Sequence, residues 1–551
     1  MPAFRTAYKV VRSFLFTAIL IVAGLYVCLY VVLSVPSVQR SVKHMVEKEV
    51  SSLLGSTVNV GSLSIFPFNE VRLSDVDVYT PSGERCISIG TVGAGIHLWK
   101  LVYERRIEIT YAEVVGLDGK VWRKSSKSPL NIDFIIRALS PKDKSKPPTK
   151  FDVKLYNVVI RKSKLSYDIL DAPRKEDSRV FDVNHVILDD FKADVALPRI
   201  KNDDFVIDLR RLSFTERCGF CIEKLGLKAE ITPQSLKVSE IVLRLPQTEL
   251  KVSDINLKFK SFDKVLNAVK SGNHLLQLTA SRLAFSDFSY FYKPLGNISG
   301  EYRLDADISG NLGDVEIEQF WLRNSQNLLN LSFEGFVTGL PVIKEISGDI
   351  RNLEFYVLSD HAVMLCDLAP GVAPRVQEII RRAGNVEINA SGKFSMPQHS
   401  SVLKADLFSG IGGLDADCQL TWDSPEAFEI SGNVASDDLD LKSLLADNRF
   451  GSAGFNATAD LSIRKKEIDV TADAIVSHID FNGETINDIS FSGEKNGNFI
   501  NGYFTVNDES VNLDADADII LDKDRSQWRV NADIRKLVPS DYNLMTKYKG
   551  Y

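Results

Sequence analysis

Residues 57–79 read TVNVGSLSIFPFNEVRLSDVDVY, with an apolar side chain at nearly every second position on each side of Pro67. Successive side chains of a β-strand point to opposite faces, so this period of two predicts two strands, each with one apolar and one polar face. The same alternation recurs along the chain, for example at Val252–Phe259 and Val511–Leu513, with turn-forming residues between the runs. Strands joined by such turns predict an antiparallel meander rather than βαβ crossovers.

A sheet of this kind must cover its apolar face. Roughly thirty strands at about 4.8 Å each would extend roughly 140 Å, and twist prevents so large a sheet from staying flat. We therefore predict a mainly β protein, built as one long, twisted, curled antiparallel sheet (a β-taco or groove) with a few short helices. Its floor would be filled by its own side chains or by acyl chains. The alternative is a row of β-sandwiches, each with its own core, and the periodicity is the same for both.

The candidate groove-lining residues share the phase of the alternation. They are Val58, Val60, Leu63, Ile65, Val71, Leu73, Val76, Val78, Ile107, Ile109, Val252 and Leu257. A slip of one residue in the register of a strand would move its members of this set to the opposite face.

Upstream of the first strand, residues 14–35 read FLFTAILIVAGLYVCLYVVLSV and contain no charged side chain. A helix of this length spans about 33 Å, roughly the hydrocarbon thickness of a bilayer. Arg5, Lys9 and Arg12 precede it, so the positive-inside rule keeps residues 1–13 in the cytoplasm. A cleaved signal peptide is the alternative, but its apolar core is normally shorter. The predicted anchor residues are Phe14, Leu15, Ile19, Leu20, Ile21, Val22, Leu25, Val27, Leu29, Val31, Val32 and Leu33.

Residues 36–55 have apolar side chains at helical spacing, and Gly55 suits the end of a helix. We interpret this stretch as an amphipathic helix that covers the end of the sheet, with a helix at the membrane surface as the alternative. Residues 56–551 then form one elongated β-groove region on the far side of the membrane. Within it, residues 140–150 (SPKDKSKPPTK) predict a flexible loop. Short helices are predicted at Pro129–Leu139, Phe262–Val269, Ala362–Leu368, Ala373–Ala383 and Leu439–Asp447.

The composition excludes some classes of protein. The net charge is −7, with no long basic stripe, so we expect no nucleic-acid partner. Six cysteines in 551 residues are too few for a disulfide scaffold. Cys218 and Cys221 form the single close pair, as a disulfide or as free thiols, and no βαβ pattern surrounds them to suggest a thioredoxin-like site.

The sequence gives no local signal for catalysis, and we predict a protein that is not an enzyme. The seven histidines are scattered, and no HExxH, Gly-x-Ser-x-Gly or GxxxxGK[ST] motif is present. We therefore assign no catalytic, cofactor-binding or metal-binding residue. Asp514, Asp516 and Asp518 would share one face of a strand and could bind Ca²⁺, but a solvated polar face explains them better.

Four stretches carry a resemblance to a known family. Residues 37–85 (SVQRSVKHMVEKEVSSLLGSTVNVGSLSIFPFNEVRLSDVDVYTPSGER) follow the anchor, and residues 107–123 (IEITYAEVVGLDGKVWR) come next. Later elements of the same type are SGEYRLDADISGNLGDVEI at 299–317 and DDLDLKSLLADN at 437–448. In pattern and order the chain resembles AsmA-like proteins, and most closely the TamB family, the inner-membrane subunit of the translocation and assembly module.

The resemblance implies a single-pass protein of the bacterial inner membrane, with its bulk in the periplasm as a long apolar groove. It also implies a part in phospholipid transport between the two membranes and in outer-membrane protein assembly. The implied partners are phospholipid, the inner membrane and an outer-membrane β-barrel assembly protein. Family members meet that barrel through a C-terminal domain, which we do not recognise before Tyr551.

Two functions follow as expectations. The first is a membrane-anchored lipid conduit of cell-envelope biogenesis, in which acyl chains lie on the apolar floor. The second is a scaffold or chaperone that helps outer-membrane proteins to assemble, or proteins to be secreted, by offering strand edges.

Overall fold

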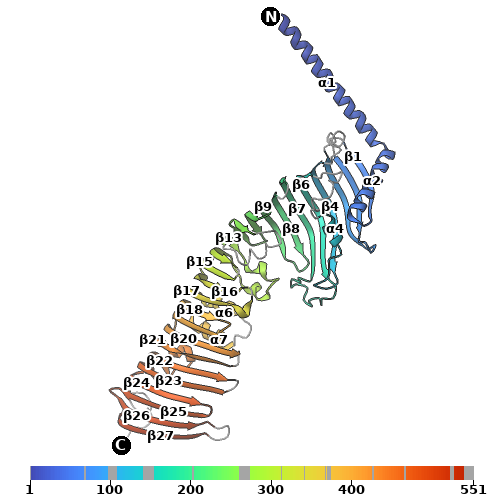
Figure 1. The fold of residues 1–551 in the computed structure, drawn as a ribbon. Helices are drawn as coiled ribbons and strands as arrows, with labels where there is room; N and C mark the ends of the chain where they lie inside the picture. Colours follow the sequence, from blue (N-terminus) through green and yellow to red (C-terminus); the bar gives the residue numbers. More distant parts are fainter. Residues whose placement is uncertain are drawn as a thin grey trace. The chain divides into compact units, whose positions relative to one another are not determined.

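The computed structural model describes the backbone of most of the chain. The described residues are 2–66, 70–96, 108–139, 154–201, 204–259, 274–311, 313–340, 342–366, 368, 374–424, 427–464, 467–521 and 526–538. The chain divides into two compact units, of which unit 1 comprises Met1–Glu249 with Asp287–Lys293, and unit 2 the remainder. Both are mainly β, as the alternation predicts (Figure 1).

Unit 1 begins with two helices and continues almost entirely as strands. Its elements are α1 (Pro2–Ser34), α2 (Pro36–Leu54), β1 (Val58–Phe66), β2 (Glu70–Tyr79), β3 (Arg85–Ile96), β4 (Glu108–Arg123), α4 (Asp133–Leu139), β5 (Lys154–Leu155), β6 (Asn157–Ile169), β7 (His185–Lys201), β8 (Asp204–Glu216), β9 (Cys221–Thr232) and β10 (Ser235–Arg244).

Most strands of unit 1 pair with their neighbours in the chain, and these pairs are antiparallel. The exception is β4, which pairs in parallel with β5 and β6. The prediction of a wholly antiparallel sheet was therefore wrong at this place. A parallel pair needs a long crossover, and the segment between Arg123 and Asn157, which contains α4, supplies it. Alternation of apolar and polar residues is the same in either pairing, so the sequence could not reveal it.

Helix α2 covers the outer edge of β1. The backbone N–H of Val58 donates to Ser51 Oγ at 3.0 Å, and that of Val60 donates to Glu47 Oε1 at 2.9 Å. The helix ends at Gly55, which has φ 65°, a left-handed conformation that glycine adopts without strain. Unpaired N–H groups at a sheet edge invite association with other strands, and here two of them are satisfied within the chain.

Unit 2 is a longer series of strands with a few short helices. Its elements, including those at the boundary, are β11 (Glu249–Val252), β12 (Ile255–Lys258), β13 (His274–Leu283), η2 (Phe285–Phe288), η3 (Lys293–Asn297), β14 (Tyr302–Asn311), β15 (Asp314–Asn324), β16 (Leu329–Thr338), η4 (Ile343–Glu345), β17 (Ser347–Val357), α6 (Ser359–Cys366), α7 (Pro374–Ala383), β18 (Val386–Ser395), β19 (Ser400–Ser409), β20 (Gly412–Ser424), β21 (Ala427–Asp440), α8 (Leu441–Leu445), β22 (Phe450–Arg464), β23 (Glu467–Phe481), β24 (Glu484–Asn496), β25 (Phe499–Asn507), β26 (Val511–Ile520) and β27 (Gln527–Leu537).

From β13 to β27 each strand pairs antiparallel with the next one in the chain. Figure 1 shows this series side by side from green to red, as an open sheet. Among the described strands, β27 pairs only with β26, and all its residues are exposed. The prediction of a mainly β chain with a long sheet and few helices is therefore confirmed, and the sheet of unit 2 is open.

The apolar N-terminal stretch is helical, in α1. Its predicted anchor residues Ile19, Leu20, Ile21, Val22, Leu25, Val27, Val31 and Val32 are exposed and Leu33 is half-buried, whereas the side chains of Phe14, Leu15 and Leu29 lie outside the described set. Within the described residues, no helix taken alone has the length and apolar composition needed to cross a bilayer. Ile19–Ser34 and Pro36–Leu54 meet that requirement as a pair, with a bend of 74° between them.

The predicted short helices coincide in part with observed ones. Pro129–Leu139 corresponds to α4, Ala362–Leu368 to α6, Ala373–Ala383 to α7 and Leu439–Asp447 to α8. Phe262–Val269 and the loop at 140–150 lie outside the described residues.

Candidate functional site

The main feature of unit 2 is an apolar row that crosses the sheet at mid-strand. One residue from each strand belongs to it, and each is the register partner of the next. From β13 to β27 the row consists of Leu278, Ala306, Phe320, Phe333, Leu353, Ala390, Ala405, Ala416, Val434, Ala457, Ala474, Phe491, Phe504, Ala515 and Ala532. We call the face that carries this mid-strand row the inner face.

The opposite face has a different chemistry. The residues next to the mid-strand row along each strand point to this opposite face and form a register row of their own. They include Asp305, Ser332, Glu354, Asp406 and Thr505. Polar side chains dominate this outer face, as expected for a sheet with one solvated side. The alternation predicted from the sequence thus separates two surfaces of opposite polarity.

Helices cover one end of the inner face. Tyr302, Leu329 and Val357 are buried there, and Ala362 and Leu365 of α6 pack against them. Farther along, Leu441 and Leu444 of α8 pack on a second buried cluster of Ala383, Ile411 and Leu439. These helices protect the strand ends and leave the mid-strand row outside both clusters.

Several large apolar side chains of the inner face remain open to solvent. Leu403 is 40% exposed, Ile468 42% and Phe491 41%. Each pairs with a residue of the inner face, as Phe491 does with Ala474 and Phe504. Leu403, Ile468 and Phe491 lie apart on β19, β23 and β24, and the row members Ala306, Ala390 and Ala515 are buried, so the exposed apolar side chains are separate places for an apolar ligand or partner.

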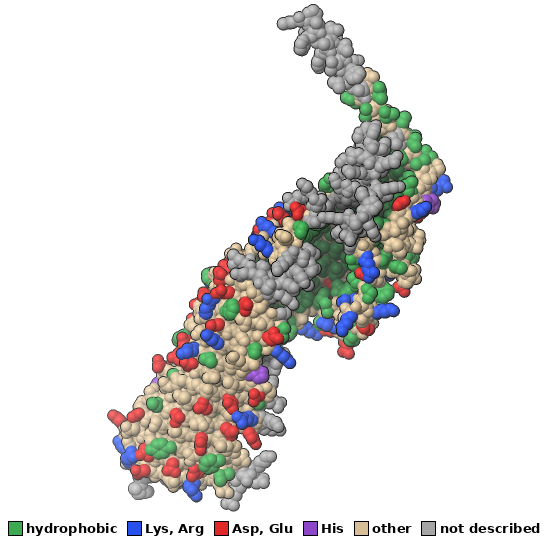
Figure 2. Space-filling model, viewed as in Figure 1, with side chains coloured by type: hydrophobic (Ala, Val, Ile, Leu, Met, Phe, Trp, Pro, Cys, Tyr) green, Lys and Arg blue, Asp and Glu red, His purple; other side chains and the backbone are tan. Residues whose placement is uncertain are grey.

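Unit 1 has an apolar hollow of its own. Figure 2 shows hydrophobic side chains gathered in a hollow over the strands around β4 to β8. A row of apolar register partners runs from β1 to β4, since Val60 pairs with Val76, Val76 with Ile89, and Ile89 with Leu117.

The predicted groove residues of β1 and β2 lie on this face but beneath helices. Val58, Val60, Val76 and Val78 form a buried cluster with Cys86. Val50 and Leu54 of α2 pack on the cluster, and so do Phe134 and Ile135 of α4. The face is therefore a closed core at β1–β3.

The other predicted groove residues are distributed more widely. Leu63, Ile65 and Leu257 are buried, and Val71, Leu73, Ile109 and Val252 are half-buried. Ile107 lies outside the described residues.

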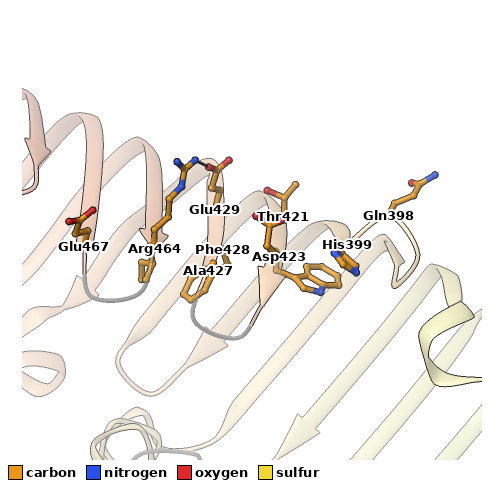
Figure 3. Close-up of a pocket in the computed structure, with 11 residues that line it drawn as sticks. Gln398, His399, Thr421, Asp423, Ala427, Phe428, Glu429, Arg464 and Glu467 are labelled. Atoms are coloured by element: carbon orange, nitrogen blue, oxygen red, sulfur yellow. Dashed lines mark hydrogen bonds and ion pairs between the residues drawn. The ribbon is translucent and has the colours of Figure 1, made fainter.

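A cavity of about 1160 Å³ lies at one rim of unit 2, beside the turns after β18, β20 and β22. Trp422, Phe428 and Ile463 belong to the inner face here, since they are successive register partners. The imidazole of His399 stacks on the indole of Trp422, with ring centroids 6.1 Å apart. Figure 3 shows Glu429 and Arg464 paired on β21 and β22, and Arg464 Nη2 lies 2.7 Å from Glu429 Oε1. This rim places aromatic and aliphatic groups next to a charged pair.

The close cysteine pair has free thiols. Cys218 is buried, and its backbone N–H donates to Glu216 Oε2 at 2.6 Å. Burial, followed by the neighbouring Glu216 carboxylate, raises the pKa of the Cys218 thiol to about 11. A thiol in this state is a poor nucleophile at neutral pH, which argues against redox catalysis at this pair.

The predicted Asp514, Asp516 and Asp518 lie on the outer face among donors. Asp514 pairs with Arg535, Asn531 donates to Asp516 at 2.8 Å, and Asn501 donates to Asp518 at 2.7 Å. Among the residues that the structure describes, no three His, Cys, Asp or Glu side chains gather as a metal site.

Sequence reasoning did not find the rim cavity, or a second hollow on the outer face around Trp321 and Tyr356. The sequence does contain a feature that indicates the hollow around Trp321 and Tyr356. Trp321 lies between Phe320 and Leu322, and Tyr356 lies between Phe355 and Val357, so both aromatics are out of phase with the apolar alternation. An out-of-phase aromatic residue on a half-buried strand is expected on the solvated face.

No family model, curated protein or solved structure matches this chain.

Proposed function

We propose that this chain is a membrane-anchored periplasmic protein of cell-envelope biogenesis that carries phospholipid between the inner and outer membranes. The mid-strand row from Leu278 to Ala532 is the observation that supports this most directly, because it offers acyl chains an apolar path across the strands from β13 to β27. Burial of each CH₂ group on such a path is worth about 0.8 kcal/mol. Carriage of this kind needs a continuous apolar surface and no catalytic residue.

The rim at His399 and Trp422 supports the same function. Acyl chains on the inner face would pass Phe428 and Ile463, while a polar head group would extend over the rim to Glu429 and Arg464, which are in the outer-face phase of β21 and β22. A lipid has this division of polarity, and a purely apolar ligand does not.

The proposal includes α1 as the anchor, with residues 1–13 in the cytoplasm. Its exposed aliphatic side chains suit hydrocarbon, and the pair of helices bent at Pro36 has the length and composition for a span. The resemblance to AsmA-like proteins of the TamB type points to the same location.

The test is lipid carriage by two matched variants. Phe491→Asp places a carboxylate on the inner face, where Phe491 is 41% exposed, and Ile475→Asp places one on the outer face, where Ile475 is 67% exposed. A charge in an apolar path without a partner is strongly unfavourable. The full chain and both variants are extracted from bacterial membranes in mild detergent, and co-purifying phospholipid is counted by mass spectrometry.

We expect Phe491→Asp to lose about nine tenths of its phospholipid and Ile475→Asp to keep it. Equal phospholipid on the two variants, or none on the unaltered chain, would contradict the proposal.

A second candidate function is a scaffold for outer-membrane protein assembly by strand addition, and the exposure of β27 favours it. Within the described residues β27 has one strand neighbour, so its other edge is open to an incoming strand. A photo-crosslinker at Arg529 should then capture a β-barrel protein in cells. Capture there together with a chain free of lipid would favour the scaffold over the conduit.

A further inference from the structure

The outer face of unit 2 carries a hollow of about 590 Å³ over β15 to β18. Two rows of register partners line it. The first row is Arg323, Asn330, Tyr356 and Glu387, and the second is Trp321, Ser332, Glu354 and Asn389. All eight lie on the opposite face from the mid-strand row, and Leu331 and Phe355, which are in the inner-face phase, complete the lining between them.

In and beside this hollow, strands that contribute an aromatic residue alternate with strands that contribute an amide. Trp321 lies on β15 and Tyr356 on β17, and the first row continues through Glu387 to Phe408 on β19. The intervening strands carry the amides Asn330 and Asn389. Alternate strands lie about 9.6 Å apart, so Tyr356 and Phe408 recur at that interval across the sheet, and Trp321 lies two residues along β15 from their row. Trp321 is 39% exposed and Phe408 51%.

The charged groups of the hollow have few partners within the chain. No ion pair joins Arg323, Glu354 or Glu387 to another residue in the described part of the chain, and Glu354 accepts a hydrogen bond from Asn352 at 3.3 Å. Asn330 Oδ1 is buried there without a hydrogen-bond partner. The guanidinium of Arg323 lies over the Trp321 ring, 4.6 Å from its centroid, and holds the indole in place. Carboxylates accept hydrogen bonds, a guanidinium donates them, and amides do both.

The chemistry of these side chains restricts the class of ligand that the hollow could bind. Two carboxylates against one guanidinium disfavour phosphate and nucleic acid. The centre of a protein interface is depleted in carboxylates, whereas here they line the hollow beside the rings. A pyranose sugar fits, since its C–H face packs on an aromatic ring while its hydroxyls both donate and accept.

We propose that this outer hollow binds a glycan strand, a linear chain of β-linked pyranoses laid across β15 to β19. Every second sugar contacts one of the rings of Trp321, Tyr356 and Phe408, and the hydroxyls between them bond to Asn389 and Glu387. The site would hold the protein to a polysaccharide while the inner face remains free.

The test is co-sedimentation of the full chain, in detergent micelles, with purified murein sacculi that have been treated with protease. Sacculi present the glycan in many copies, so a weak site gives measurable retention. Trp321→Ala removes the central ring, Trp321→Phe keeps an aromatic ring, and Tyr503→Ala removes an outer-face aromatic remote from the hollow, where Tyr503 is 48% exposed. Soluble hexameric N-acetylglucosamine serves as competitor and dextran as control.

We expect the unaltered chain and Tyr503→Ala to sediment with the sacculi, Trp321→Ala to lose binding by about tenfold or more, and Trp321→Phe to recover most of it. The hexamer should release the bound protein and dextran should not.

No sedimentation of the unaltered chain would overturn the proposal, as would equal loss in Trp321→Ala and Tyr503→Ala. Binding only to sacculi that retain their proteins would identify a protein partner instead. Circular dichroism of each variant shows whether a loss of binding comes from unfolding. None of these outcomes depends on lipid carriage.

Discussion

Glu47 joins a helix to the edge of the sheet through one carboxylate. Its Oε1 accepts from the Val60 N–H at 2.9 Å, and its side chain is 20% exposed. A hydrogen bond to a charged group contributes about 1.5–3 kcal/mol. In Glu47→Ala we expect amide exchange of Val58–Phe66 to quicken about tenfold or more, as measured by hydrogen-exchange mass spectrometry. Glu49→Ala, on the exposed side of α2, is the control and should leave that exchange unchanged.

The same carboxylate makes this contact sensitive to acid. Burial alone would raise the pKa of Glu47, but the hydrogen bond from Val60 and the neighbouring His44 and Lys43 lower it overall. A group whose pKa is lower in the folded state stabilises that state above its ordinary pKa, about 4.3, and loses the effect as the pH falls below it. We expect β1 exchange to quicken below about pH 4 in the unaltered chain, and Glu47→Gln to flatten that dependence. An unchanged acid response in Glu47→Gln would contradict this assignment.

The two neighbouring thiols should react at very different rates. With a pKa of about 11, Cys218 is ionised in roughly one molecule in a thousand at pH 8, and it is also buried. Cys221 is half-buried. Brief treatment with iodoacetamide, followed by peptide mass spectrometry, should label Cys221 first. Faster labelling of Cys218 would mean that the Glu216 environment is absent in solution.

Single residues show where sequence reasoning succeeds and stops. Gly55 could be recognised as a helix end because a left-handed φ at that position favours glycine. The partners of Glu47 could not be recognised, because its bond to Val60 depends on how α2 packs against β1.

At the scale of an element, α6 is held to the sheet through a buried polar contact. Tyr302 is 1% exposed, and its hydroxyl lies 2.9 Å from His361 Nε2 of α6. Tyr302→Phe would leave that nitrogen buried without its partner, which costs about 1–3 kcal/mol. We expect faster proteolysis within Ser359–Cys366 at unchanged global secondary structure. Tyr503→Phe, which alters an exposed hydroxyl, should cleave at the original rate.

Elements were predictable to the extent that periodicity defines them. The alternation identified strands such as β1, β2 and β26 because each has one covered face. The pairing partner of a strand, and whether the pair is parallel or antiparallel, are properties that periodicity does not define. The parallel pairing of β4 with β6 and the two-row hollow around Trp321 both depend on register between strands, and local pattern does not encode that register.

At the scale of the whole molecule, the proposed anchor makes a direct prediction. Arginine at Ile21 and Val27 would place two charges in the apolar stretch, at about 2.5–3.5 kcal/mol each near the bilayer centre. The double variant should leave the membrane pellet on carbonate extraction, and the unaltered chain should remain in it. Leucine at both positions is the matched control. Retention of the arginine variant would contradict α1 as the anchor.

The pairing of each strand with its predecessor predicts local stability in unit 2. A stop after Asn507 removes β26 and β27, whose backbone contacts are to β25 and to each other. We expect amide protection in β13–β24 to be unchanged and protection in β25 to fall, because contributions in such arrays are dominated by nearest neighbours. Loss of protection throughout unit 2 would show that the sheet folds as one cooperative body.

Consecutive pairing also bears on how such a chain can change over evolutionary time. A hairpin inserted or deleted between two strands of unit 2 preserves the direction of all the others, and it lengthens or shortens the sheet by about 9.6 Å. The apolar phase continues across the new pair if its residues alternate in step with the row from Leu278 to Ala532. Insertion or deletion of hairpins can therefore change the length of the sheet in steps of two strands, while each face of the sheet keeps its polarity.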